Sequence, residues 1–263
     1  MPEIDEYTQH EKEFLQKHWN GCEKQDVLQE INSWIDWGLK LVVSNDLNSL
    51  FEEIKERFNG ETVRELRDNW SGFDERFVVT LDTTHATKSP GKILEKLVRE
   101  WLNSNKPETP ALNRYNFKTE LTDCIRFRYE VNFLEDAEKL YQFVLEEAKD
   151  PSAELCKELA LREDKCTCNV HDRLSERVKG ERSWKFQFVH RKTRYQVELQ
   201  ICTQLQVAWD KKDHFLIYER RRRGMNVPEG DHILMKHVSD QLYVVDRQLD
   251  ELRKKIEKEL GQI

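Results

Sequence analysis

Two acidic residues lie in apolar segments of the sequence, where a carboxylate needs a partner. Asp123 falls in LTDCIRFR (121–128) and Glu198 in YQVELQICT (195–203). An unpaired charge in such a strand-like segment is costly unless a cation or hydrogen bonds compensate it. Mg²⁺ prefers one or two carboxylates together with substrate phosphates, so the pair could form a magnesium site. Alternation along a strand also allows each side chain to point into water, and spacing alone favours this simpler alternative.

Three lysines recur at four-residue steps around a helix start. Lys88, Lys92 and Lys96 flank Ser89-Pro90, a favoured order for the first turn of a helix. One stripe of ammonium groups near the positive end of a helix dipole suits a polyphosphate. The same spacing is typical of a solvated helix face, and spacing alone favours that alternative.

Arginines supply further cations for phosphate oxygens, which guanidinium groups bind in a bidentate manner. Those in or near the expected strands are Arg126, Arg128 and Arg182. A separate run is the densest basic stretch of the chain: Arg220, Arg221, Arg222 and Arg223. Such a run is typical of a solvated helix end. Beside a phosphate site it could instead hold an anionic acceptor such as RNA.

The cysteines offer a weaker hypothesis. Four possible zinc ligands lie within a short stretch: Cys156, Cys166, Cys168 and His171. Their spacing matches no standard zinc motif, so a structural zinc is the less favoured alternative. The chain has six cysteines and begins without the basic-then-apolar order of an export signal, so we expect free thiols and a cytoplasmic location.

Composition limits the function classes. The 263 residues include 43 Lys and Arg against 50 Asp and Glu, a net charge of −7. This balance argues against sequence-independent nucleic-acid binding by the whole chain, although it leaves room for a local basic pocket. Seven Trp and an aromatic share of 10% favour a packed core over disorder. No run approaches the ~18 apolar residues of a membrane span, so we expect no membrane partner.

The elements that position these residues follow from periodicity. Apolar faces at three- and four-residue steps predict helices over residues 1–70, with Asn59-Gly60 as a stop. Strands are predicted at 77–81, 121–131, 184–190 and 195–201, and further helices from 90, after 131 and over 203–218. Residues 150–181 are poorly periodic and form either a mobile loop or a small helical insertion. The order predicts a mixed α/β sheet, of the α+β kind, with helices packed on it.

The C-terminal segment has a coiled-coil-like seam. Its apolar residues step by three and four: Met235, Val238, Leu242, Val245, Leu249, Leu252 and Ile256. This pattern predicts one long amphipathic helix. Pairing with a second copy or a partner, such as an antitoxin, and packing on the chain's own domain are equally favoured.

Glycine-rich phosphate loops of the Walker and GxGxxG types are absent, as is the G-x-S-x-G elbow. Four segments instead resemble, in order, the motifs of RelA/SpoT-type alarmone synthetases across about 75–223. They are Lys88-Ser89-Pro90 with Ile93 and Lys96, LTDCIRFR (121–128), Lys179-Gly180-Glu181-Arg182-Ser183, and VELQICTQLQVAWDKKDHFLIYE (197–219). The resemblance is to the small stand-alone synthetases, including toxin-type members.

This resemblance implies a nucleotidyltransferase-like synthetase domain over 71–225, a helical region over 1–70 and a long C-terminal helix over 226–263. It implies transfer of the β,γ-pyrophosphate of ATP to the ribose 3′-hydroxyl of a guanosine nucleotide. Asp123 would bind Mg²⁺, and Glu198 would complete the metal site or act as the base.

The remaining site roles also rest on the resemblance and on position. The triphosphate of ATP would contact Lys88, Lys96, Arg128, Arg182, Lys92, Arg126 and His214. The acceptor would lie near Glu181 and the arginine run 220–223.

Three positions depart from the family pattern. Ala86 replaces an arginine, Glu181 replaces a tyrosine that stacks on guanine, and Cys202 replaces an arginine. Two alternatives to alarmone synthesis follow. One is toxin-type pyrophosphorylation of the tRNA 3′ end. The other is a catalytically degenerate nucleotide sensor or interaction module.

Overall fold

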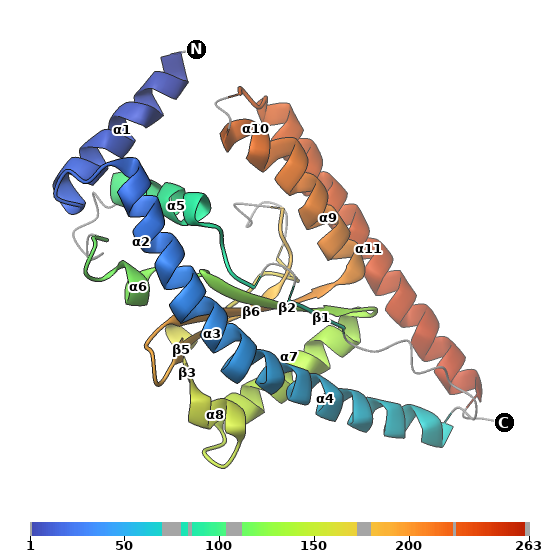
Figure 1. The fold of residues 1–263 in the computed structure, drawn as a ribbon. Coiled ribbons are helices and arrows are strands. Elements are labelled where there is room, and N and C mark those ends of the chain that lie inside the picture. Colours follow the sequence, from blue (N-terminus) through green and yellow to red (C-terminus); the bar gives the residue numbers. More distant parts are fainter. Residues whose placement is uncertain are drawn as a thin grey trace.

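The computed structural model describes residues 2–69, 80–83, 86–103, 112–172, 180–222 and 225–260. The N-terminal region is helical, as predicted. Two π-helical segments join all of its helices except the first into one rod from residue 24 to 69 (Figure 1). These elements are α1 (Pro2–His18), α2 (Lys24–Trp34), η1 (Ile35–Leu39), α3 (Lys40–Val42), η2 (Val43–Leu47) and α4 (Asn48–Asn69). The predicted stop at Asn59-Gly60 is wrong. A Cβ on Gly60 would meet nothing within 4 Å, so this glycine marks no tight turn or close approach.

A mixed sheet lies at the centre of the fold, in the order β1-β2-β6-β5-β3, with β4 paired to β5. Only β2 and β6 run parallel among the described strand pairs. The strands are β1 (Thr80–Asp82), β2 (Ile125–Val131), β3 (Leu159–Leu161), β4 (Thr167–Cys168), β5 (Trp184–His190) and β6 (Gln196–Thr203). The mixed α/β class is therefore confirmed. The predicted strand 77–81 lies partly outside the described residues.

The segment 150–181 differs from its prediction. It contains α8 (Glu154–Glu158), the strands β3 and β4, and a 3₁₀ turn, η4 (Glu163–Lys165). Both strands pair with β5 and extend that edge of the sheet. They are only two or three residues long, which is too short for alternation to appear in the sequence.

One face of the sheet is apolar and holds the main core. The ring of Phe51 on α4 lies 4.6 Å from Phe127 on β2, and Tyr141 stacks at 4.7 Å on Phe186 of β5. Tyr141 belongs to α7 (Leu134–Lys149), so α4 and α7 both cover this face. Alternation along each strand directs the intervening side chains to the opposite face. That second face is polar and lies between α5 (Pro90–Asn103) and α9 (Gln204–Asp213) (Figure 1).

The helix α9 continues without a break through η6 (His214–Tyr218) into α10 (Glu219–Arg222), and the long α11 (Glu229–Leu260) lies alongside (Figure 1). The short α6 (Phe117–Glu120) precedes β2 earlier in the chain. Trp209 of α9 is 3% exposed, and its indole nitrogen donates a 2.7 Å hydrogen bond to the carbonyl of Met235. This contact anchors α11 against α9.

The apolar seam of α11 divides into two halves. Its first residues, Met235, Val238 and Leu242, pack on Trp209 and Ile217, so packing on the chain's own domain is confirmed for this half. The second half stays between 37% and 52% exposed: Val245, Leu249, Leu252 and Ile256. Pairing of that half with a second copy or an antitoxin stays a prediction, which sedimentation of the purified protein tests. The boundaries near 70 and 225 likewise stay predictions.

The second half of α11 meets the domain through polar side chains. Thr203, which caps α9, donates a 2.6 Å hydrogen bond to Oδ2 of Asp246, while Oδ1 of Asp246 has no partner among the described residues. Arg253 forms an ion pair with Asp136 of α7 at 2.8 Å. Burying such groups requires specific partners, which explains why α11 keeps a defined position without its apolar stripe.

We expect Asp246→Asn to stabilise the protein at neutral pH. Burial raises the pKa of Asp246 to about 6, so the folded chain binds this proton more tightly than the unfolded chain does. Stability from this group falls as pH rises between roughly 4, the unfolded pKa, and 6. The amide carries no charge, so the melting temperature at pH 7.5 should rise by about 2–4 °C and by less at pH 4.5. Exposed Glu251→Gln serves as the control. If Asp246→Asn changes the melting temperature equally at both pH values, the raised pKa of Asp246 is contradicted.

No helix among the described residues is both long and apolar enough to span a membrane.

Candidate functional site

Polar side chains align in two rows across the polar face. Strand register places Arg128 of β2 opposite Gln200 of β6, and Gln200 opposite Lys185 of β5. The neighbouring row runs from Arg126 through Glu198 to a glutamine of β5. Because adjacent strands in register place paired side chains on one face, these groups lie together. Periodicity leaves open which way Glu198 points, and the structure directs it to this face.

Asp123 lies just before β2, in a turn and not in the predicted strand. Its φ of 56° is left-handed, a conformation that Asp and Asn tolerate better than most residues. The turn brings the carboxylate to two lysines: Lys96 at 2.5 Å and Lys88 at 3.1 Å. Burial acts to raise the pKa of Asp123, but the two ammonium groups outweigh it and lower the pKa below its ordinary value. Asp123 is therefore ionised at neutral pH.

The lysine stripe expected on one helix does not form. Lys88 precedes α5, and its backbone N–H donates to the carbonyl of Cys124. Lys96 of α5 is buried at 7% exposure and also donates to the carbonyl of Thr122 at 2.6 Å. The simpler alternative of a solvated face is wrong for these two lysines. Lys92 is exposed and lies toward η6, where it lowers the pKa of His214 after the larger effect of burial.

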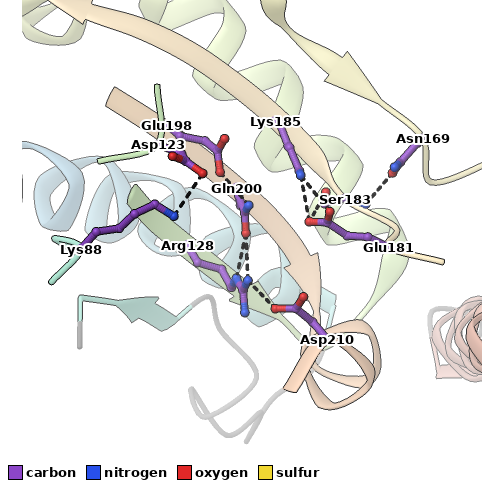
Figure 2. Close-up of polar contacts among 10 residues, drawn as sticks. All are labelled: Lys88, Asp123, Arg128, Asn169, Glu181, Ser183, Lys185, Glu198, Gln200 and Asp210. Atoms are coloured by element: carbon purple, nitrogen blue, oxygen red, sulfur yellow. Dashed lines mark hydrogen bonds and ion pairs between the residues drawn. The ribbon is translucent and has the colours of Figure 1, made fainter. Parts of the chain in front are cut away.

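A continuous chain of hydrogen bonds joins Glu198 to α9 (Figure 2). The amide nitrogen of Gln200 donates to Glu198 at 2.7 Å, and its oxygen accepts from Arg128 at 2.9 and 3.1 Å. Arg128 also donates to Asp210 of α9 at 2.8 Å. Gln200 thus fixes the orientation of Glu198 relative to the buried guanidinium group. Arg126 lies beside Glu198 in the strand register and contributes, with Lys92, to the positive potential around His214.

Glu181 lies on the opposite side of Gln200, where it forms a 2.9 Å ion pair with Lys185 (Figure 2). Both side chains are 24% exposed. The preceding Gly180 packs so closely on Trp209 that a Cβ atom would collide with the indole ring. The loop therefore requires glycine at that position and holds Glu181 over the sheet.

Cys202, where the family motif has arginine, is a buried neutral thiol. Burial raises its pKa to about 12, although Arg128 and Lys185 act in the opposite direction. Ala86 is also buried, and its carbonyl accepts a 2.8 Å hydrogen bond from the backbone of Arg126. Cys202 and Ala86 thus each place a neutral side chain where the family motif has an arginine, on the polar face or at its edge.

The arginines divide between the site and other contacts. Arg182 is 4% exposed and donates to Asp240 of α11 at 2.6 Å, with its guanidinium group 4.3 Å from the Tyr243 ring. In this structure it therefore supports α11 and does not face the row that holds Arg128. Arg220 pairs with Asp231 at 3.0 Å, and Arg221 is exposed. The side chains of Arg222 and Arg223 lie outside the described residues.

The proposed zinc ligands do not form a cluster. Among the described residues, no group of three or more His, Cys, Asp or Glu side chains is placed to hold a metal ion. Cys166 instead donates to the carbonyl of Arg162, and His171 contacts the hydroxyl of Tyr243 at 2.7 Å. The cysteines of the described structure are free thiols, as predicted.

Three members of the site are not predicted from the sequence: Gln200, Lys185 and Asp210. Gln200 and Lys185 carry a recoverable signal, because they alternate with apolar residues in strands whose polar face already holds Glu198. Asp210 lies on a helix whose contact with β2 depends on tertiary packing, so no local pattern identifies it.

Comparison with solved structures gives the same architecture. The small alarmone synthetase 1 of Bacillus subtilis, bound to its product pppGpp, aligns with a TM-score of 0.53 at 17% identity, over 84% of this chain and 98% of that chain. A GTP pyrophosphokinase family protein from Streptococcus pneumoniae gives 0.53 at 16% identity, over 87% and 98%. The small alarmone synthetase 2 of Bacillus subtilis gives 0.51 at 16%, over 88% and 98%. The sequence matches no protein-family model and no curated protein.

These likenesses extend over most of this chain and nearly all of the solved ones, and they include the mixed sheet and the long last helix. The chain has the fold of the small alarmone synthetases, as the resemblance of its motifs predicts.

Proposed function

We propose that this chain is a pyrophosphokinase that transfers the β,γ-pyrophosphate of ATP to the ribose 3′-hydroxyl of a guanosine nucleotide. The observation that carries the proposal is Glu198, held by the Gln200–Arg128 chain at the same end of the parallel strands as Asp123 and its lysines. The fold, which the solved synthetases share, supports the same assignment.

The proposed reaction is a single displacement. The 3′-oxygen attacks the β-phosphorus of ATP, the bond from that phosphorus to the α,β-bridging oxygen breaks, and AMP leaves. Glu198 accepts the hydroxyl proton, which requires an ionised carboxylate within hydrogen-bonding reach of the acceptor. Such transfers depend mainly on positioning and on charge stabilisation. Lys88, Lys92 and Arg126, at the edge near α5, would contact the triphosphate.

The donor set fits a magnesium ion. Asp123 and Glu198 offer carboxylate oxygens near the same end of neighbouring strands, and Mg²⁺ takes few protein carboxylates when substrate phosphates supply other ligands. These two residues would hold it. A bound Mg²⁺ would supply neutralisation of phosphate charge during the transfer.

One surface favours a second candidate, the tRNA 3′ end as acceptor. Beyond the site, α9 and η6 expose basic and aromatic side chains together: Lys211, Lys212 and Phe215, the last at 74%. Exposed aromatic rings interspersed with cations suit single-stranded nucleic acid. Glu181 cannot stack on guanine, which also supports this candidate.

Label transfer from γ-labelled ATP with Mg²⁺ tests both candidates. GMP, GDP, GTP, ATP and deacylated tRNA would be offered in parallel, with Glu198→Gln as control. We expect label on a guanosine nucleotide and none with the control. Label on tRNA alone would replace the proposal with the second candidate. ATP binding without transfer to any acceptor would contradict both and favour a nucleotide sensor.

A further inference from the structure

Asp210 of α9 reaches the polar face from outside the sheet, and no step of the proposed reaction uses it. Its carboxylate accepts a 2.8 Å hydrogen bond from the guanidinium group of Arg128 on β2 (Figure 2). The side chain of Arg128 is only 9% exposed, whereas that of Asp210 is 37% exposed. A guanidinium group buried to this degree needs a counter-charge, and Asp210 supplies it.

The contact between Asp210 and Arg128 decides which way the amide group of Gln200 faces. A guanidinium group has donors and no acceptor, so it can bind only the oxygen of that amide. Arg128 donates to this oxygen through two nitrogens, at 2.9 and 3.1 Å. The amide nitrogen of Gln200 is thereby turned to Glu198 and donates to its carboxylate at 2.7 Å. With the amide reversed, two oxygens would face each other and repel.

Arg128 also has a second carboxylate nearby, that of Glu198. Gln200 is opposite Arg128 in the strand register, and Glu198 lies two residues before Gln200 on the same face of β6. A guanidinium group released from Asp210 would therefore turn toward Glu198. A direct ion pair with arginine would occupy the carboxylate that has to accept the hydroxyl proton and would make it a weaker base.

The helix that carries Asp210 is anchored on both sides of it. The adjacent Trp209 is buried and donates to the carbonyl of Met235 on α11 at 2.7 Å. At the start of α9, the side chain of Thr203 caps the helix by accepting from the backbone N–H of Gln206. Asp210 thus projects from a fixed helix and not from a loop, which suits a group that must hold another in place.

We propose that Asp210 is a positioning residue for Glu198: by holding Arg128, it turns the amide N–H of Gln200 toward the Glu198 carboxylate and prevents a direct ion pair between Arg128 and Glu198. The inference rests on the proposed function, in which Glu198 accepts the hydroxyl proton. It extends that function to α9, whose side chain sets the orientation of the base through two intervening residues.

The test is steady-state kinetics of Asp210→Ala. We expect kcat to fall about 10- to 100-fold, the effect of a small misplacement of a reacting group, with smaller changes in the KM values for ATP and acceptor. Asp210→Glu keeps the carboxylate and should restore most of kcat. Asp240→Ala is the matched control, because Asp240 also lies on a helix and pairs at 2.6 Å with a buried arginine, Arg182, outside the chain that ends at Glu198. This control should lose stability but keep its kcat.

Two further measurements distinguish positioning from a general structural role. In the Glu198→Gln background there is no base to position, so adding Asp210→Ala should change the single-turnover rate by less than about threefold. A crystal structure of Asp210→Ala should show the Arg128 guanidinium group turned toward Glu198 or the Gln200 amide reversed.

The inference is overturned if Asp210→Ala keeps the parental kcat, or if it lowers the rate by the same factor with and without the Glu198 carboxylate. The proposed function stands in both cases. An unchanged 2.7 Å contact between Gln200 and Glu198 in the Asp210→Ala structure also overturns the inference, whether or not the protein is active. A parent protein that transfers label to no acceptor overturns the proposed function itself, and the crystal structure still decides whether Asp210 orients Glu198.

Discussion

Glu198→Gln is expected to lower kcat for pyrophosphate transfer by roughly 10²- to 10⁴-fold, the usual contribution of a positioned general base. The amide has the shape of the carboxylate but cannot take the hydroxyl proton. Its oxygen can still accept the hydrogen bond that Gln200 donates at 2.7 Å, so the Gln200–Arg128 chain should persist. The loss should therefore appear mainly in kcat.

Single-turnover transfer with saturating ATP and GDP measures this loss directly. Glu130→Gln is the matched control, because Glu130 lies on the same face of β2, two residues beyond Arg128 in the strand, and pairs in register with Cys202. The control should retain nearly full activity. A Glu198→Gln rate within a few-fold of the parent rate would exclude Glu198 as the base and leave its carboxylate at most a positioning role.

Local sequence patterns predicted most of the fold because its elements bury clear apolar faces. The strand predicted at 184–190 begins and ends as observed, and Ser89-Pro90 marks the start of α5 correctly. The exceptions are the elements whose sequence lacks periodicity. β3 and β4 are too short to alternate, and α4 continues through Gly60 because one internal glycine costs a helix only about 1 kcal/mol.

The site residues could be named from the sequence, but their partners could not. The sequence pattern predicts that Asp123 lies in a strand, whereas its left-handed backbone turns it to Lys88 and Lys96. That meeting joins residues 27 positions apart, which no periodic pattern encodes. For Arg182, the motif suggests a role that its contacts in the structure do not show. Its motif suggests phosphate binding, but Asp240 of α11 engages it at 2.6 Å, and only tertiary packing brings α11 there.

Asp123→Asn is expected to destabilise the protein and to abolish most activity. Two ammonium groups would face each other without the carboxylate that now separates them, and Lys96 is only 8% exposed at its side chain. We expect a loss of about 1–3 kcal/mol in the free energy of unfolding, below the cost for a fully buried pair. The expected loss is smaller than for a fully buried pair because Asp123 and Lys88 keep 26% and 25% of their side-chain surface exposed. Asparagine tolerates the left-handed φ as aspartate does, so backbone strain adds little.

The pH dependence of this loss identifies its cause. Because the pKa of Asp123 is lowered in the folded state, the carboxylate stabilises the fold above the unfolded pKa of roughly 4. That contribution disappears as pH falls through the folded pKa. Denaturant unfolding of parent and Asp123→Asn should therefore differ most between about pH 6 and 8 and converge below about pH 4. A difference that is constant with pH would point to lost packing instead of lost charge.

Combining Asp123→Asn with Lys96→Met separates the structural role of Asp123 from its role in the reaction. Methionine removes the buried unpaired ammonium group while filling similar space, so the double variant should recover much of the lost stability. Activity should not recover, because the carboxylate proposed to hold Mg²⁺ is still missing. Pyrophosphate transfer by the double variant at near-parental rates would show that Asp123 acts only by neutralising Lys96, and the metal would then need another ligand on this face.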